Sequence, residues 1–180
     1  EQFQKISDEI LALRKEGFEV TLVSSGAIAI GTKQIGLDRK PAQMSERQAL
    51  AAIGQSRLMR QWSDAFSRDN VVVAQVLLTH EDLKNRKRYL NARNAIESIH
   101  AMGSIPIVNE NDTVATDEIK LGDNDNLSAQ VAALVSADLL IILSIFDGLY
   151  DLDPLKNAEA QRIPFVDAID ESVVQLGASG

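Results

Sequence analysis

The segment most informative about a functional site is the polar stretch from Gly122 to Ala129, Gly-Asp-Asn-Asp-Asn-Leu-Ser-Ala. Two carboxylates and two amides follow the glycine, and an apolar, helix-like run comes next. Such side chains beside the free N–H groups of a helix start suit phosphate or carboxylate chemistry. A surface turn with a capping residue is an alternative explanation of Asp123 to Asp125, and a Mg²⁺ site is a further one.

Two further polar segments follow apolar runs of the kind that form buried strands. Ser24-Ser25-Gly26 is a tight turn whose glycine lets the backbone approach a ligand, although an ordinary turn between a strand and a helix reads the same way. Asn109-Glu-Asn-Asp112 is either an Asx-rich turn or a binding loop. In the second case, Asn109 and Asp112 would hold the ammonium group and the carboxylate of a small zwitterion.

The elements expected to position these loops alternate along the chain. The apolar spacing predicts helices at residues 3–16, 27–31, 45–67, 79–102 and 127–136, the fourth of them opened by a capping box of Thr79 and Asp82. It predicts strands at residues 18–24, 71–78, 105–109 and 139–143, and a hairpin strand at 118–121. Because the main strands are apolar on both faces, we expect a three-layer α/β/α sandwich with a mostly parallel sheet. Ligands would then bind at the carboxyl ends of the strands, where residues 144–150 supply a fourth loop.

Composition narrows the class of protein. The 180 residues suffice for one domain, and a net charge of -8 argues against a nucleic-acid or membrane surface. The sequence has no cysteine, which is compatible with the cytoplasm, and no apolar run of the ~18 residues that a membrane span needs. The chain begins directly in a predicted helix and ends in a loop composition, so we expect missing ends.

Taken together, the motifs resemble the amino acid kinase family, and within it the members that phosphorylate glutamate. The resemblance covers nearly the whole chain and is most specific in the Asn-Glu-Asn-Asp and Gly-Asp-Asn-Asp-Asn-Leu-Ser-Ala segments. The matching stretches are Val23 to Gly31, Leu50 to Arg57, Tyr89 to Arg93, Ile105 to Val114, Gly122 to Ala129, and Gly148 to Tyr150 with Asp153-Pro154.

The resemblance implies an enzyme that transfers the γ-phosphate of ATP to the 5-carboxylate of L-glutamate, the first step of proline biosynthesis. It also implies Mg²⁺ bridging the phosphates, proline as a feedback inhibitor, a homo-oligomer (dimer or tetramer) and a cytoplasmic location. Three alternatives remain at this point: another amino acid kinase, a non-catalytic sensor that binds glutamate or proline, or the kinase half of a bifunctional pyrroline-5-carboxylate synthase.

The resemblance assigns roles to particular positions. Asp125 would be catalytic, organising lysines that stabilise the transferring phosphoryl group. The loop from Ser144 to Tyr150 would border the nucleotide through Ser144, Ile145, Asp147 and Tyr150, although the family usually carries aspartate where Ile145 stands. The substrate amino acid would contact Ser25, Gly26, Asn109, Asp112, Asp123 and Asn124.

Two elements of the family have no counterpart in residues 1–180. One is a first strand with a phosphate-binding lysine, and the other is a later glycine-rich loop with its own lysine. We therefore expect a single amino acid kinase domain over 1–180 that lacks its first strand and its C-terminal nucleotide-binding portion. A chain that ended at Glu1 and Gly180 would be inactive or nearly so. Lys120 is the nearest candidate for neutralising ATP.

Overall fold

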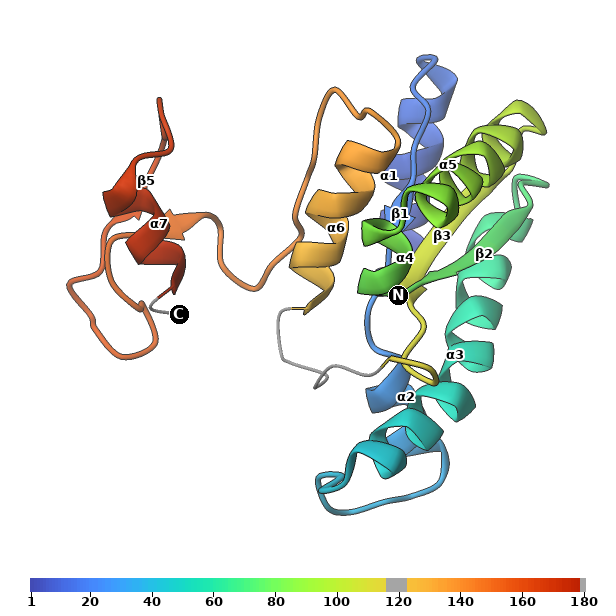
Figure 1. The fold of residues 1–180 in the computed structure, drawn as a ribbon, viewed down its shortest axis with the longest axis horizontal. Helices are drawn as coiled ribbons and strands as arrows, with labels where there is room; N and C mark the ends of the chain where they lie inside the picture. The colour runs from blue at the N-terminus through green and yellow to red at the C-terminus, as the bar shows by residue number, and fades with distance from the viewer. Residues whose placement is uncertain (116–122, 179–180) are drawn as a thin grey trace. The chain divides into compact units, whose positions relative to one another are not determined.

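The computed structural model describes residues 1–115 and 123–178 and divides into two compact units, Glu1–Leu140 and Ile141–Gly180. Figure 1 shows the first unit as helices around a small sheet. The predicted hairpin strand at 118–121 lies outside the described residues.

The sheet of the first unit is parallel. Its three strands are β1 (Leu22–Val23), β2 (Val73–Leu78) and β3 (Ile105–Glu110), in the order β1-β3-β2. In the register, Val23 pairs with Val108, and Leu77 pairs with Asn109. The prediction for residues 18–24 was too long, because β1 has only two residues in the ladder with β3.

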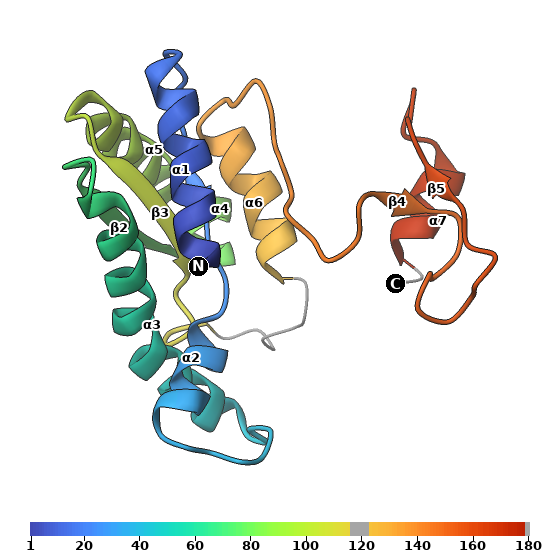
Figure 2. The same ribbon diagram turned by 180° about the vertical axis from the view of Figure 1, so that it is seen from behind.

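Helices cover both faces of this sheet, as Figures 1 and 2 show from opposite sides. On one face, α1 (Gln2–Lys15) and α3 (Met44–Ser67) pack on Ile105 and Ile107 of β3, together with the first residue of α2 (Ala27–Gln34). On the other face, α5 (Arg86–Ala101) and α6 (Asp123–Leu134) pack on Val108. Successive residues of β3 thus point into two cores, which confirms the predicted three-layer α/β/α arrangement.

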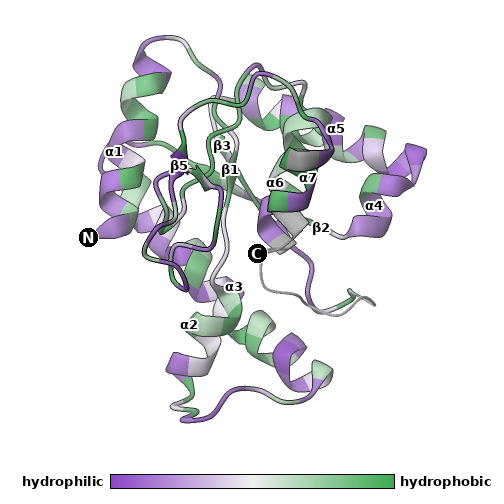
Figure 3. Cartoon of the chain, turned by 90° about the vertical axis from the view of Figure 1, so that its left-hand side faces the viewer, coloured by the Kyte–Doolittle hydropathy of each residue, from purple (hydrophilic) through white to green (hydrophobic). Residues whose placement is uncertain are grey.

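The helices are amphipathic, as this layering requires. Figure 3 shows hydrophilic and hydrophobic segments alternating along α1 and α4 (His80–Lys84). In α1, Ile10 and Leu11 are buried while most of the remaining side chains reach the surface. None of the helices in the described part of the chain combines the length and apolar character that a membrane span requires.

Two predicted elements were wrong. Residues 79–102 form two helices, because the chain turns at Asn85, whose side-chain oxygen accepts from the N–H groups of Lys87 and Arg88 and opens α5. The capping box of Thr79 and Asp82 that opens α4 is present as predicted.

The predicted strand at 139–143 is irregular instead, with side chains 40–74% exposed. A strand needs a neighbour for its backbone hydrogen bonds, and no described strand pairs with this run. The second unit contains β4 (Leu149–Tyr150), which is antiparallel to β5 (Arg162–Ile163), and α7 (Glu171–Ala178).

Candidate functional site

The candidate site of the first unit lies at the carboxyl edge of its sheet. Because all three strands run parallel, β1 and β3 end at this edge, and their polar loops begin there. The chain enters α6 at the same edge, as both opposite views show (Figures 1 and 2). Ligands of open parallel sheets bind at such edges. Three of the four predicted loops therefore converge, and the fourth belongs to the second unit.

The turn after β1 presents free backbone donors. Ser24 stays in the sheet, since its N–H donates to the carbonyl of Val108 over 2.9 Å. Ser25 and Gly26 are exposed, and Gly26 has a φ of 101°, a left-handed conformation that favours glycine. Gly26 is the N-cap of α2, and no side chain caps the helix. The first N–H groups of α2 are therefore available to an anion.

The end of β3 places a buried amide at the same edge. The side chain of Asn109 is only 3% exposed, and its Nδ2 donates to Oε1 of Gln55 in the middle of α3 over 2.8 Å. A buried amide of this kind is held in one orientation by its partner, because leaving it unpaired costs free energy. Asn109 is thus fixed by α3 rather than by its own loop.

The loop after β3 folds into a turn that α3 also holds. The N–H groups of Val114 and Ala115 donate to the carbonyl of Asn111, and the Thr113 hydroxyl donates to the Asn111 side chain over 2.7 Å. The predicted Asx-rich turn therefore exists only from Asn111 onward, because Asn109 and Glu110 still belong to β3. Asp112 lies within this turn and is half-buried.

The first turn of α6 carries the third group of predicted site residues. Asp123 is the first helical residue, Asn124 is half-buried, and Asp125 is exposed. The Oδ1 atom of Asn124 is buried and has no hydrogen-bond partner among the described residues. Gly122 and Lys120, which precede the helix, lie outside the described residues.

The predicted nucleotide loop lies in the second unit. Tyr150 donates a 2.6 Å hydrogen bond to the carboxylate of Asp147, and this bond lowers the pKa of Asp147 and raises that of Tyr150. Arg162 lies 3.7 Å from the same carboxylate. The hydroxyl of Ser144 accepts a long bond from the N–H of Phe146, and Ile145 is 88% exposed. The loop is thus braced by Asp147, while Ile145 presents an apolar side chain.

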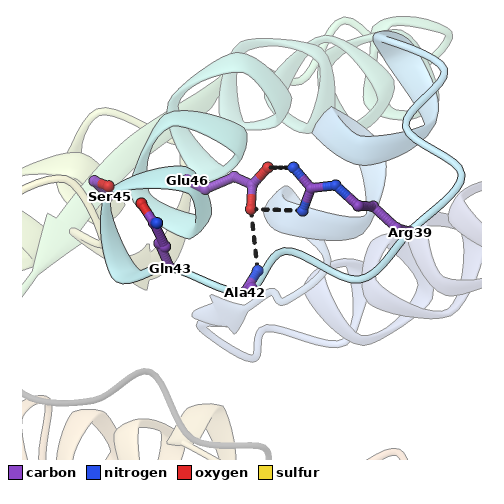
Figure 4. A pocket seen from close by; sticks show the side chains of 5 residues that line it. All are labelled: Arg39, Ala42, Gln43, Ser45 and Glu46. Carbon is purple, nitrogen blue, oxygen red and sulfur yellow. Dashed lines mark hydrogen bonds and ion pairs between the residues drawn. The ribbon is translucent and has the colours of Figure 1, made fainter.

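An open pocket at the start of α3 contains none of the predicted site residues. The residues that line it are Arg39, Ala42, Gln43, Ser45 and Glu46. Arg39 and Glu46 form a two-pronged ion pair, and the N–H of Ala42 donates to the same carboxylate, as Figure 4 shows. These bonds lower the pKa of Glu46 and satisfy its charge, so the pocket offers no free charged group from that pair.

Sequence reasoning missed three side chains that position the site. Gln48, Gln55 and Trp62 stand seven residues apart on α3, a spacing that puts them on one helical face. Gln48 donates to the carbonyl of Ala115, and the indole N–H of Trp62 donates to the Ser24 hydroxyl over 2.9 Å. Together with the bond from Asn109 to Gln55, one face of α3 holds residues next to both loops. Their seven-residue spacing alone does not distinguish the two glutamines from surface residues of the helix.

Comparisons with known proteins relate the chain to one family and to several named relatives. The model of the amino acid kinase family matches residues 1–178. The chain is 54% identical over 171 residues to a glutamate 5-kinase of Meiothermus ruber, covering 95% of this chain and 45% of the relative. A protein of the same name from Thermus thermophilus is 51% identical, and the match covers 98% of this chain and 48% of that protein. One from Pseudomonas putida is also 51% identical, and the match covers 92% of this chain and 45% of that protein.

The chain spans about half the length of the curated relatives that it matches. The family model, in contrast, covers almost every residue of the chain, including both polar motifs at the carboxyl edge. The chain belongs to the amino acid kinase family.

Proposed function

We propose that the protein uses ATP to phosphorylate the 5-carboxylate of L-glutamate, giving L-glutamyl 5-phosphate for proline biosynthesis. The observation that carries the proposal is the convergence of Asn109 with the starts of α2 and α6 at one sheet edge, in a chain about half identical to proteins named glutamate 5-kinase. The polar groups at this edge are mostly neutral, as suits the recognition of a zwitterion by hydrogen bonds.

In this proposal the substrate amino acid lies at the carboxyl edge. Its ammonium group and α-carboxylate lie near the end of β3, and its 5-carboxylate points toward the nucleotide. The buried, unpaired Oδ1 of Asn124 supports the proposal, because it is an acceptor suited to an ammonium group. The binding residues are Ser25, Gly26, Asn109, Asp112, Asp123 and Asn124.

The proposed reaction is a direct in-line transfer. A 5-carboxylate oxygen attacks the γ-phosphorus, the bond from that phosphorus to the β–γ bridging oxygen breaks, and ADP leaves. The protein contributes position and charge stabilisation rather than a covalent nucleophile. The uncapped N–H groups of α2 support this role, since they can face a phosphoryl group or a carboxylate. Asp125 would organise the lysines of the reaction, and its exposed position leaves it accessible to them.

Mg²⁺ would accompany ATP. Within residues 1–115 and 123–178, no group of three or more acidic, histidine or cysteine side chains is arranged to hold a metal ion. Mg²⁺ in kinases is commonly held by substrate phosphates with one or two carboxylates. The ion would offset the charge of the phosphates.

The remaining parts of the proposal concern the nucleotide and the assembly. Ser144, Ile145, Asp147 and Tyr150 would border ATP, with Asp147 held in place by Tyr150. Proline would act as a feedback inhibitor at the glutamate pocket, and the protein would form a homo-oligomer in the cytoplasm. These remain predictions that follow from the family resemblance.

The test is an activity measurement on the complete gene product. ATP, Mg²⁺ and glutamate are incubated with hydroxylamine, which traps glutamyl phosphate as a hydroxamate. We expect hydroxamate with glutamate and none with aspartate or N-acetylglutamate. Turnover of aspartate or N-acetylglutamate without turnover of glutamate would instead identify another amino acid kinase.

A sensor is the second candidate, and the exposed apolar Ile145 in the nucleotide loop is the observation that favours it. Calorimetry separates the two functions. A kinase binds both glutamate and an ATP analogue, whereas a sensor binds glutamate or proline and no nucleotide.

A further inference from the structure

Gln55 lies on the part of α3 that is next to the end of β3 and the start of α2. Its neighbour Gly54 packs against the first turn of α2, so closely that a Cβ on Gly54 would overlap the carbonyl oxygen of Ala27. Its own Oε1 accepts the 2.8 Å hydrogen bond from Asn109 at the end of β3. The Gln55 side chain is therefore held at the end of β3, and its helix neighbour Gly54 lies against the start of α2.

Half of the Gln55 amide is unused. Its Nε2 atom is buried and has no hydrogen-bond partner among the described residues. A buried donor without a partner costs free energy, so such groups in folded proteins usually serve a ligand, a bound water or a reaction. The amide is oriented with its Oε1 accepting from the N–H of Asn109. The two N–H bonds of Nε2 are the part left for a ligand.

The sequence around the site shows what such a donor would recognise. The three segments at the carboxyl edge read Ser-Ser-Gly-Ala at 24–27, Asn-Glu-Asn-Asp-Thr-Val-Ala at 109–115 and Asp-Asn-Asp-Asn at 123–126, without lysine or arginine. The hydrogen-bond donors that these three segments offer to a carboxylate are therefore neutral N–H and O–H groups. The buried acceptor of Asn124 and the buried donor of Gln55 together complement the ammonium group and the carboxylate of an α-amino acid.

We infer that the Nε2 amide of Gln55 donates to the α-carboxylate of the substrate and so selects an α-amino acid with a free α-carboxyl group. The inference rests on the proposed function, which places glutamate at this edge with its 5-carboxylate toward ATP. Gln55 is then a specificity-determining residue with two hydrogen bonds. Its Oε1 accepts from Asn109 and holds that side chain, and its Nε2 donates to the α-carboxylate of the substrate. A purely structural glutamine would fix Asn109 and do nothing more.

Gln55→Glu separates these two roles. The new carboxylate keeps the side-chain length and still accepts from Asn109, but it replaces the N–H donor by an anionic oxygen that repels the α-carboxylate. The experiment uses the complete gene product and compares glutamate with its α-amide, in which the α-carboxylate is a carboxamide and the 5-carboxylate is unchanged. Ser56→Glu is the matched control, because it adds the same charge to the exposed side of the same turn.

For glutamate, Gln55→Glu should lower kcat/KM about ten- to hundredfold, mostly through KM, while the KM for ATP stays the same. The α-amide can donate to the new carboxylate, so the preference for the α-amide over glutamate should rise at least about tenfold relative to the wild type. Ser56→Glu should change neither value. Gln55→Leu, which removes both polar atoms, should lose activity toward glutamate without gaining a preference for the α-amide.

The outcomes are distinguishable from a failure of the proposed function. If the wild type forms glutamyl hydroxamate and Gln55→Glu keeps its KM and its preference, the inference is wrong and the proposed function stands. If the wild type forms no hydroxamate, the proposed function is wrong. Calorimetry then measures the affinities of the wild type and of Gln55→Glu for glutamate and for its α-amide, and the ratio of the two affinities tests the same preference. If Gln55→Glu does not fold, as circular dichroism would show, Gln55→Leu carries the test, and an unchanged glutamate KM there overturns the inference.

Discussion

Gly54 and Ala27 bring two helices together backbone to backbone. A Cβ built on Gly54 would lie 1.8 Å from the carbonyl oxygen of Ala27, and one built on Gly31 would lie 2.0 Å from that of Leu50. Since a peptide carbonyl in a helix cannot swing aside, neither glycine can be replaced while α2 and α3 keep their distance. This contact sets where α2 begins, and hence where the exposed turn of Ser25 and Gly26 stands.

Gly54→Ala should therefore destabilise the protein and displace that turn. In an open helix, alanine would be more stable than glycine by about 1 kcal/mol. Here the clash outweighs that gain, and we expect a net loss of about 1–3 kcal/mol in the free energy of unfolding, with a higher KM for glutamate. Urea unfolding measures the loss. Ser63→Ala, at an exposed position of the same helix, should be nearly neutral. A stabilised Gly54→Ala protein would show that the helices can move apart freely.

The hydrogen bond from Trp62 to Ser24 should be worth a measurable part of the stability. Ser24→Ala would leave the buried indole N–H without an acceptor, at a cost of about 1–3 kcal/mol. In a Trp62→Phe background the same serine change should cost far less, because no donor is stranded. Urea unfolding followed by circular dichroism compares the four proteins of this cycle. Equal costs in both backgrounds would mean that the bond contributes nothing to folding.

Much of the fold could be predicted because its elements carry their own periodicity. The long α3 and the buried β3 were found within about two residues of their observed ends, since their apolar residues face a core formed within the first unit. The predicted strand at 139–143 failed because an apolar run becomes a strand only when another strand supplies hydrogen bonds. The prediction of a single helix over 79–102 was wrong at Asn85, because the side chain of Asn85 caps the N-terminus of a second helix there.

The site could be predicted only in part. The polar loops stood out, because Asn109 and the turn at Ser25 interrupt apolar runs at strand ends. The side chains of α3 that hold these loops did not stand out, since a glutamine within a helix reads as surface until its partner is known. Gln55 and Gln48 were recognisable only through contacts with residues 54 and 67 positions away in the sequence.

His100 should make the stability of the protein depend on pH. Burial lowers its pKa below the ordinary value of 6.5, and its Nε2 lies 2.9 Å from the Thr21 hydroxyl. Because the folded pKa is depressed, the unfolded state takes up the proton first. This contribution is therefore present above about pH 6.5 and is lost as pH falls through the folded pKa. Proton NMR should find His100 titrating below 6.5. Between about pH 7.5 and 5, His100→Gln should reduce the fall in stability.

Asn124→Leu should make the ligand-free protein more stable and weaken its binding of glutamate. Its buried Oδ1 has no partner among the described residues, so the folded, ligand-free protein carries the cost of an unpaired acceptor. Asn124→Leu removes that acceptor and also suits a helix better. We expect the free energy of unfolding without ligand to rise by about 1 kcal/mol, and the KM for glutamate to rise about tenfold or more because the ammonium group loses its acceptor.

The matched control for this exchange is Asn126→Leu, on the same turn of α6 but exposed. It gives the helix the same gain in propensity without removing a buried polar atom. The difference between the two variants in the free energy of unfolding, measured in urea, therefore gives the cost of the unpaired Oδ1. The KM for glutamate in the hydroxamate assay shows whether Oδ1 contributes to binding. If both variants gained equally in stability, the acceptor would carry no cost. If Asn124→Leu also kept the wild-type KM, glutamate would bind without Asn124, and its ammonium group would have to find its acceptors at Asn109, Asp112 or Asp123.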